Sequence, residues 1–278
     1  MKKFSPLIFC LILFISSSLA QSSIELQDEF GPVNLEDMMA RLDGFAYWHL
    51  SNKPENKLLI RIEGGTDRWF AFPFMQGAIM KAYLTNMRRI PGEQVLVQYC
   101  EIGDVEIRKQ LFLVPPGAKI ESCNEQIILP EQTKYFSGFS ENPYNNFDEK
   151  ADGCCYIEGA GEAVSKIENE ILLKLVSQNP EMKIYLIGYA GHFTISKEKQ
   201  NKNGEWITEE KTKTDSKKII DKLLKKEKTR LEKTGINSSK IFTIRGGYME
   251  DQRSVKLFLV PKDGEIPKPE PDYFPKKK

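Results

Sequence analysis

The sequence predicts an α/β protein, an α+β two-layer sandwich made of two repeated units, each a mixed β-sheet covered on one face by two helices. Leu111-Phe112-Leu113-Val114-Pro115 returns as Leu257-Phe258-Leu259-Val260-Pro261. Pro54 and Pro180 begin a second matched pair of segments, and an apolar run follows each proline. The two pairs are offset by 146 and 126 positions, so an insertion of 20 residues in the later copy accounts for the difference. A repeat of this kind indicates one structural unit used twice.

The first copy alternates between helical and strand patterns. Apolar residues recur at helical spacing across residues 35–50, behind a capping pattern formed by Asn34 and Asp37. The short apolar run at 57–62 is typical of a strand covered on both faces. We therefore expect helices at 35–50 and 78–89 and strands at 24–30, 57–62, 95–99 and 105–114.

The second copy repeats this order and adds a hairpin. Asn203-Gly204 is a strong hairpin turn signal, and it lies between two segments with strand patterns, at 192–199 and 205–210. Short strands are expected at 127–129 and 135–136. The remaining expected elements are a helix that starts at Gly161, a strand at 183–189, a lysine-rich helix at 215–233 and strands at 241–245 and 254–260.

The N-terminus has the pattern of a secretory signal. Two lysines follow Met1, an apolar run covers residues 7–15, and Ser18-Leu19-Ala20 offers a cleavage site. The apolar run is shorter than the ~20 residues that a membrane span needs. We expect a secreted or periplasmic protein with no transmembrane span after cleavage. The predicted parts are a signal peptide at 1–20, a first unit at 21–118, a second unit at 119–262 with a hairpin insertion near 192–212, and a disordered tail at 263–278.

The charge balance argues against nucleic acid as a partner. Without Lys2 and Lys3 the chain has 38 basic and 39 acidic side chains, so no overall field attracts a polyanion. Residues 195–240 are the exception, with 14 basic and 8 acidic residues. The favoured interpretation is a solvated helix face, and the alternative is a surface that rests on cell-wall glycan or anionic lipid head groups.

Four cysteines remain in the mature chain, Cys100, Cys123, Cys154 and Cys155. In an oxidising compartment some of them should be paired, but four thiols allow three connectivities. Adjacent cysteines pair with each other only in a strained ring. We expect Cys123 to join Cys154 or Cys155, which closes the segment between the repeats.

Three segments resemble the C-terminal domain of outer-membrane protein A, the OmpA-like domain. The resemblance is found mainly in Pro180 to Gly191 and in Leu231 to Tyr248, and more faintly in Ala78 to Ile90. The chain is also similar to uncharacterised secreted bacterial proteins with tandem degenerate units of this kind. The resemblance implies a module of the bacterial cell envelope.

The OmpA-like family binds peptidoglycan through an aspartate just after one strand and an arginine on the following helix. In the second copy the corresponding segment, Ile187 to Gly191, has no aspartate. In the first copy Asp67 stands one position later than the aspartate of the family motif. The position of the family's arginine falls at about Gln76. A zwitterionic end group needs both charges facing it. Asp67 is therefore only a weak candidate for ligand binding.

The sequence offers no set of residues for catalysis, a metal or a cofactor. Of the two histidines, His49 lies on the apolar side of the first predicted helix, where a packed or snorkelling side chain is the favoured interpretation. His192 is distant from any cysteine or acid at ligand spacing, whereas a zinc site normally needs three or four converging groups. A catalytic triad would have to use one of the two histidines. The glycines of Gly159-Ala160-Gly161 imitate a dinucleotide fingerprint, but a turn before a helix is the favoured interpretation.

These observations lead to three hypotheses. The first is a non-enzymatic extracytoplasmic binding or structural protein of the bacterial envelope, with cell-wall glycan or another envelope protein as its partner. The second is an OmpA-like module that binds peptidoglycan through a rearranged site that includes Asp67. The third and least favoured is an enzyme of an unrecognised type, which would need a deep pocket with converging acids.

Overall fold

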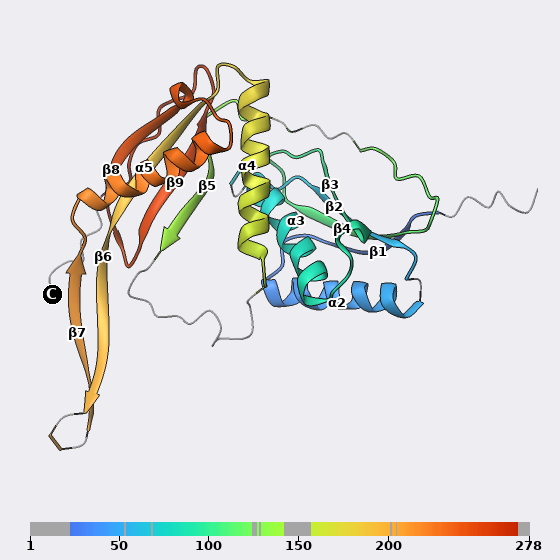
Figure 1. Ribbon diagram of the computed structural model, residues 1–278, viewed down its shortest axis with the longest axis horizontal. Coiled ribbons are helices and arrows are strands. Elements are labelled where there is room, and N and C mark those ends of the chain that lie inside the picture. Colours follow the sequence, from blue (N-terminus) through green and yellow to red (C-terminus); the bar gives the residue numbers. More distant parts are fainter. Residues whose placement is uncertain are drawn as a thin grey trace, which may run out of the picture.

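The computed structural model describes residues 23–271, apart from residues 53, 68, 124–126, 128, 142–156, 201 and 204. Within these residues the chain forms a four-stranded sheet, a five-stranded sheet and four α-helices (Figure 1). The predicted fold class, a sandwich of two units with mixed sheets, is confirmed. The expected signal peptide lies outside the described residues.

The first unit is a mixed sheet with two helices. Its elements are β1 (Glu25–Phe30), α2 (Leu35–Asn52), β2 (Lys57–Glu63), α3 (Phe72–Ala82), the π-helix η1 (Tyr83–Met87), the 3-10 helix η2 (Gly92–Gln94), β3 (Val95–Cys100) and β4 (Arg108–Val114). The strand order is β1-β4-β2-β3. Strands β2 and β3 are parallel, and β4 is antiparallel to both β1 and β2.

The second unit repeats this arrangement. Its elements are β5 (Lys134–Glu141), α4 (Ala160–Gln178), β6 (Lys183–Gln200), β7 (Trp206–Thr214), α5 (Lys218–Lys233), the 3-10 helix η3 (Ser238–Lys240), β8 (Ile241–Glu250) and β9 (Arg253–Val260). Strand β9 lies between β5 and β6, and β6 also pairs with β8 in parallel. Without β7, the order β5-β9-β6-β8 corresponds to β1-β4-β2-β3.

The two sheets share their register as well as their strand order. Leu58 lies opposite Leu113 in the first sheet, and Ile184 lies opposite Leu259 in the second. The later pair stands 126 and 146 positions after the earlier one, the two offsets that the sequence repeat has. A slip of one residue would turn each apolar set to the opposite face, so a shared register requires a shared pattern of burial.

The helices and the inner faces of the sheets build one continuous apolar core. In the first unit α2 contributes Leu42 and Phe45, and α3 contributes Phe74. In the second unit α4 contributes Leu175 and α5 contributes Leu224. These side chains pack with the buried residues of the strands, so each sheet has its helices on the core side.

A β-bulge at Phe136 joins the two units. The register of β5 against β9 shifts between Tyr135 and Ser137, as the register of β1 shifts at the corresponding place. A bulge turns the extra residue out of the ladder. Here the Phe136 carbonyl accepts a hydrogen bond from the Ala71 amide at 3.0 Å, and the Phe136 ring stacks on Phe70 at 6.0 Å between centroids. Helices α3 and α4 pack beside this junction, with α4 between the two units (Figure 1).

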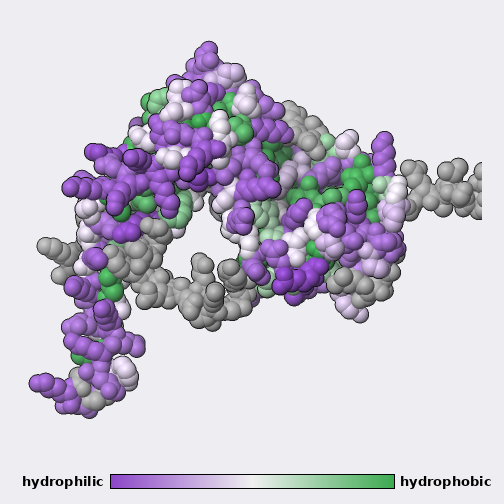
Figure 2. Space-filling view, in the orientation of Figure 1, coloured by the Kyte–Doolittle hydropathy of each residue, from purple (hydrophilic) through white to green (hydrophobic). Residues whose placement is uncertain are grey.

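The predicted hairpin is present as a long arm. Strand β6 runs unbroken from Lys183 to Gln200. Its distal half pairs with β7, from His192 opposite Thr214 to Gln200 opposite Trp206. The arm projects away from the sheet, and its surface is mostly hydrophilic, as is much of the surface over α5 (Figures 1 and 2). Trp206 at the distal end is 69% exposed.

Two predicted secondary-structure elements differ from those of the structure. The helix expected at 78–89 begins at Phe72, because Pro73 fits the first turn of a helix, and it passes into the π-helix at Tyr83. Within the described residues, the strand expected at 127–129 amounts to an isolated bridge between Ile127 and Ile102.

The tail at 263–278 is expected to be disordered, and residues 272–278 of it lie outside the described residues. Residues 263–271 lie in the described part, and Glu265 and Glu270 contact residues of the second unit. The Glu270 amide donates to the Tyr189 hydroxyl at 3.0 Å, and Lys256 Nζ lies 2.5 Å from the Glu270 carboxylate. Prolines restrict the unfolded chain, so such a segment loses less entropy when it docks.

Candidate functional site

Helices α4 and α5 form a groove over one edge of the second sheet, which we call the α4–α5 groove. Its cavity has a volume of about 330 Å³. It is lined by Met75, Ser137, Gly138, Phe139, Val164, Ser165, Glu168, Leu223, Lys226, Glu227, Arg230, Val255 and Leu257. An apolar cavity with a few converging polar groups is the usual form of a small-molecule site, and this size is at the small end of the range.

The floor of the α4–α5 groove is apolar and rigidly placed. Val255 and Leu257 stand two apart on β9, so both point to the helix side of the sheet. Leu223 on α5 closes the floor, and all three side chains are at least 93% buried. Because these residues belong to the core, the floor is fixed by the packing of the unit itself.

The polar wall of the groove comes from Glu168 on α4. The side chain is half-buried and hydrogen-bonds to the Ser137 hydroxyl on β5. Burial raises the pKa of this carboxyl above its ordinary value, although the Arg230 charge and the Ser137 hydrogen bond act in the opposite direction. Glu227 adds a smaller effect that also raises the pKa. Glu168 is therefore a carboxyl group whose charged form is poorly solvated.

Arg230 on α5 faces the same groove but is held by other partners. Its Nε and Nη2 atoms donate to the Glu227 carboxylate at 2.9 and 2.5 Å, and Nη1 donates to Asn169. Burial alone would lower the pKa of the guanidinium, but the hydrogen bond and charge of Glu227, together with the charge of Glu168, raise it. A bidentate pair of this kind fixes the guanidinium in place.

A second cavity, the α3–α4 cleft, lies where the two units meet and has a volume of about 510 Å³. Small residues such as Gly77 and Ala163 line it, together with Asn86 of the π-helix. The Tyr99 hydroxyl donates to the Phe74 carbonyl at 3.2 Å, and burial, aided by the charge of Glu170, raises the pKa of Tyr99. The cleft is more open than the α4–α5 groove and its two carboxylates, Glu162 and Glu170, are exposed, so it is the weaker candidate.

Asp67, the weak candidate from the sequence, belongs to neither cavity. It lies exposed in the turn after β2, where the preceding Thr66 amide donates to Gly103. Gln76 is instead close to a buried lysine, with 3.4 Å between Lys109 Nζ and Gln76 Oε1. The first unit therefore does not place an anion and a cation together at these positions.

The second unit does bring an anion and a cation together near the segment that the resemblance marks. Asp215 lies just before α5, and its Oδ2 atom accepts from the Gly191 amide at 3.1 Å. Arg253 at the start of β9 donates to both oxygens of Asp215, at 2.7 and 2.8 Å. Sequence reasoning missed this pair because the hairpin arm separates Gly191 from Asp215 by 24 positions.

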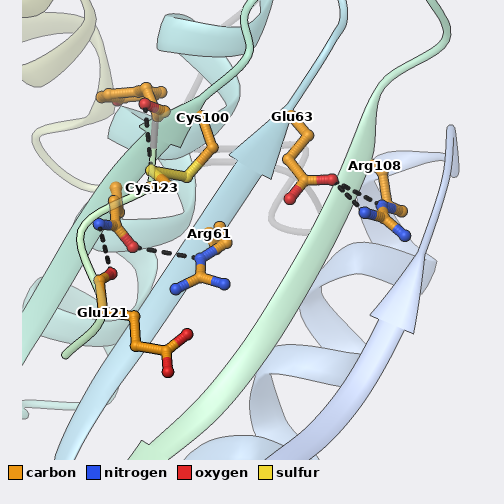
Figure 3. The surroundings of a disulfide bond; sticks show 8 residues. Arg61, Glu63, Cys100, Arg108, Glu121 and Cys123 are labelled. Carbon is orange, nitrogen blue, oxygen red and sulfur yellow. Dashed lines mark hydrogen bonds and ion pairs between the residues drawn. A yellow bond between two sulfur atoms is a disulfide. The ribbon is translucent and has the colours of Figure 1, made fainter. Parts of the chain in front are cut away.

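The disulfide differs from the expected one. Cys100, at the end of β3, is bonded to Cys123, with 5.6 Å between their Cα atoms (Figure 3). We expected Cys123 to pair with Cys154 or Cys155, both of which lie outside the described residues. The segment after β4 runs back beside β3, where Gln98 donates to the Glu121 carbonyl at 3.3 Å, and this brings Cys123 to Cys100.

The two histidines lie in separate parts of the fold. His49 is 1% exposed on the apolar side of α2, with 3.2 Å between its Nε2 atom and Gln94 Oε1. His192 lies at the base of the hairpin arm, 2.7 Å from Thr214 Oγ1. Across the described residues, no three or more His, Cys, Asp or Glu side chains are grouped as metal ligands would be. In the same part of the chain, no helix is both long and apolar enough to span a membrane.

The turn before α4 has the geometry of a helix start. Gly159 occupies the N-cap position with φ of 75°, a left-handed conformation that favours glycine. This agrees with the favoured interpretation of the glycine pattern as a turn before a helix.

The chain shows no significant match to any known family model, curated protein or solved structure. The relation to the OmpA-like domain therefore remains a proposal.

Proposed function

We propose that this protein is a non-enzymatic binding protein of the bacterial cell envelope, secreted or periplasmic, and built from two OmpA-like units. The signal pattern at residues 1–20 supports export. The disulfide between Cys100 and Cys123 supports an oxidising compartment, where such bonds persist.

The observation that carries the binding proposal is the α4–α5 groove. It combines a buried apolar floor with Glu168, a carboxyl whose pKa is raised by burial. A cavity of this kind, with a perturbed titratable group, is the default position for a ligand site. The ligand would be a small molecule or a small group that projects from a larger envelope component.

A pull-down from envelope extract tests the proposal. The mature chain is immobilised and compared with Ser165→Trp, which fills the groove from an exposed helix position, and with the matched control Ser177→Trp on the same helix. We expect a component that wild type and Ser177→Trp retain and Ser165→Trp loses. Equal recovery of the component by all three proteins, with folding verified by circular dichroism, would show that the groove does not bind it.

Peptidoglycan binding is the second candidate, and the Asp215–Arg253 pair favours it. The OmpA-like site needs an acid and a base near the end of one strand. The Asp215–Arg253 pair meets this requirement at Gly191 of β6, whose amide donates to Asp215. The two groups are already paired with each other, so a zwitterionic end group would have to exchange with their mutual hydrogen bonds.

Co-sedimentation with purified sacculi tests the second candidate. Pelleting of the wild type, with loss in the double variant Asp215→Asn/Arg253→Gln and retention in Asp67→Asn, would support the pair. Loss in Asp67→Asn alone would favour the first unit. A wild-type chain that stays in the supernatant would rule out both sites.

A further inference from the structure

The Glu168 carboxylate lies near the charge of Arg230 in the α4–α5 groove but is not hydrogen-bonded to it. Among the described residues none forms an ion pair with it, and its hydrogen-bond partner is the neutral hydroxyl of Ser137. The Arg230 guanidinium, which lines the same groove, gives its hydrogen bonds to Glu227 and Asn169. A half-buried carboxylate in this position gains strongly from a cation, because the attraction between charges is larger where water is excluded.

The other charged groups around the groove do not compensate Glu168. Lys226 on α5 lies at the mouth, with its Nζ atom 5.6 Å from the centre of the Phe139 ring. Tyr135 on β5 is influenced by the charge of Glu168, and burial keeps its hydroxyl neutral by raising the pKa. The residues from β9 that line the groove are apolar. Glu168 therefore presents a carboxylate beside the apolar floor of the groove.

The size and the lining of the groove limit what can enter. Its volume of about 330 Å³ corresponds to roughly ten water molecules at ~30 Å³ each. Leu223, Val255 and Leu257 would contact the apolar part of a ligand, while Glu168 would meet its charged end. A short alkyl chain that carries one ammonium group fits both requirements.

We propose that the α4–α5 groove binds a small organic cation, a primary amine with a short apolar chain, with Glu168 as its counter-charge and Ser137 as the residue that orients that carboxylate. This inference rests on the proposed binding function and specifies its ligand class. The amine can be a free molecule or an amino group that projects from an envelope component.

Titration of the full mature chain with n-hexylammonium tests this inference by calorimetry. Its matched probes are 1-hexanol, which has the same chain without charge, and hexanoate, which has the opposite charge. We expect saturable binding of n-hexylammonium and at least about tenfold weaker binding of the other two, because loss of a partially buried charge pair is worth this much or more. Equal binding of all three probes would overturn the assignment of Glu168.

Two variants and one control localise the effect. Glu168→Gln keeps the shape and a hydrogen bond to Ser137 and should weaken n-hexylammonium binding about tenfold or more. Lys226→Met removes the competing cation at the mouth and should strengthen it. Glu232→Gln makes the same charge change at an exposed position of α5 outside the groove and should leave the affinity unchanged. Equal losses in Glu168→Gln and Glu232→Gln would overturn the inference.

The pH dependence of amine affinity distinguishes a charge role of Glu168 from a structural one, because a structural role would not change it. The cation needs ionised Glu168, and the pKa of this group is raised, so affinity should increase with pH as the group ionises, and Glu168→Gln should abolish the increase. If amine binding fails but a component depends on the groove in the pull-down, this inference falls and the proposed function stands. If amine binding succeeds and the pull-down recovers nothing, the inference stands with a free amine as the ligand, and an amino group on an envelope component is ruled out as its source.

Discussion

Asp215 and Arg253 form a bidentate ion pair that ties the start of α5 to the start of β9, with distances of 2.7 and 2.8 Å. Their side chains are only 7% and 17% exposed. The same carboxylate accepts the Gly191 amide, so three segments of the second unit meet at one group. This junction closes the base of the hairpin arm.

Asp215→Asn should destabilise the protein because it removes the carboxylate that forms a bidentate pair with Arg253. Breaking a buried ion pair from one side costs about 3 kcal/mol or more. The control is Asp221→Asn, which breaks an exposed pair with Arg245 and should cost under about 1 kcal/mol. Urea unfolding of both variants measures the difference, and equal losses would contradict the structural role of the pair.

The same pair makes stability depend on pH. Burial alone would raise the pKa of Asp215, but the hydrogen bonds from Arg253 and Gly191 and the charge of Arg253 lower it below its ordinary value. A lowered folded-state pKa gives stability that is present above the unfolded pKa and lost as pH falls through the folded one. The difference in unfolding free energy between wild type and Asp215→Asn should therefore be constant near pH 7 and shrink below about pH 4. A difference that stays constant down to pH 2 would contradict this assignment.

The disulfide predicts a specific peptide map. Proteolysis of the oxidised, unreduced chain should give a fragment in which Cys100 is linked to Cys123. The bond closes a loop with a sequence separation of 23, so Cys123→Ser should reduce the unfolding free energy by about 3 kcal/mol. Recovery of Cys123 linked to Cys154 or Cys155 would contradict the structure and restore the expectation from the sequence.

Gly188 should resist substitution because α5 lies directly over it. A Cβ atom there would stand 2.8 Å from Leu224 Cγ and 3.1 Å from Ile220 Cγ2. Gly188→Ala should therefore destabilise the second unit by about 1–3 kcal/mol, as overpacking does. Gly161→Ala on α4 meets no atom within 4 Å and should be neutral or stabilising by up to about 1 kcal/mol. Equal thermal shifts for the two variants would show that α5 is not packed this closely.

The tail should contribute to the stability of the second unit. Tyr189 is 1% exposed on the sheet, and its hydroxyl accepts a hydrogen bond from the Glu270 amide. Truncation after Lys262 removes this bond and the partner of Lys256, so we expect a loss of about 1–2 kcal/mol. Unfolding monitored by tyrosine fluorescence measures it, and an unchanged midpoint would mean that the tail does not dock in solution.

Periodicity and repeat offsets were sufficient to predict the sheets. Leu58 and Ile184 are apolar members of runs that must face a core, so the pairing that buries one copy also buries the other. The hairpin arm followed from Asn203-Gly204, whose conformational preference is local. The apolar runs and the turn depend on neighbouring residues, which is why the sequence alone predicts them.

The candidate site depends on residues that are distant in the chain. Ser137, Glu168 and Arg230 come from β5, α4 and α5, and no local pattern indicates that they share a groove. The Cys100–Cys123 connection likewise depends on how the segment after β4 returns along β3. Only the packed sheet brings these groups together, so the sequence could name the cysteines but neither their pairing nor Glu168.

We propose that the α4–α5 groove holds a ligand from the envelope without converting it. Native mass spectrometry of the mature chain, after incubation with envelope extract, tests this directly. We expect an adduct of constant mass that persists on prolonged incubation, is released chemically unchanged, and is absent from the groove-filled variant Ser165→Trp. Release of a molecule that differs from the one bound, or the same adduct on Ser165→Trp, would contradict the claim.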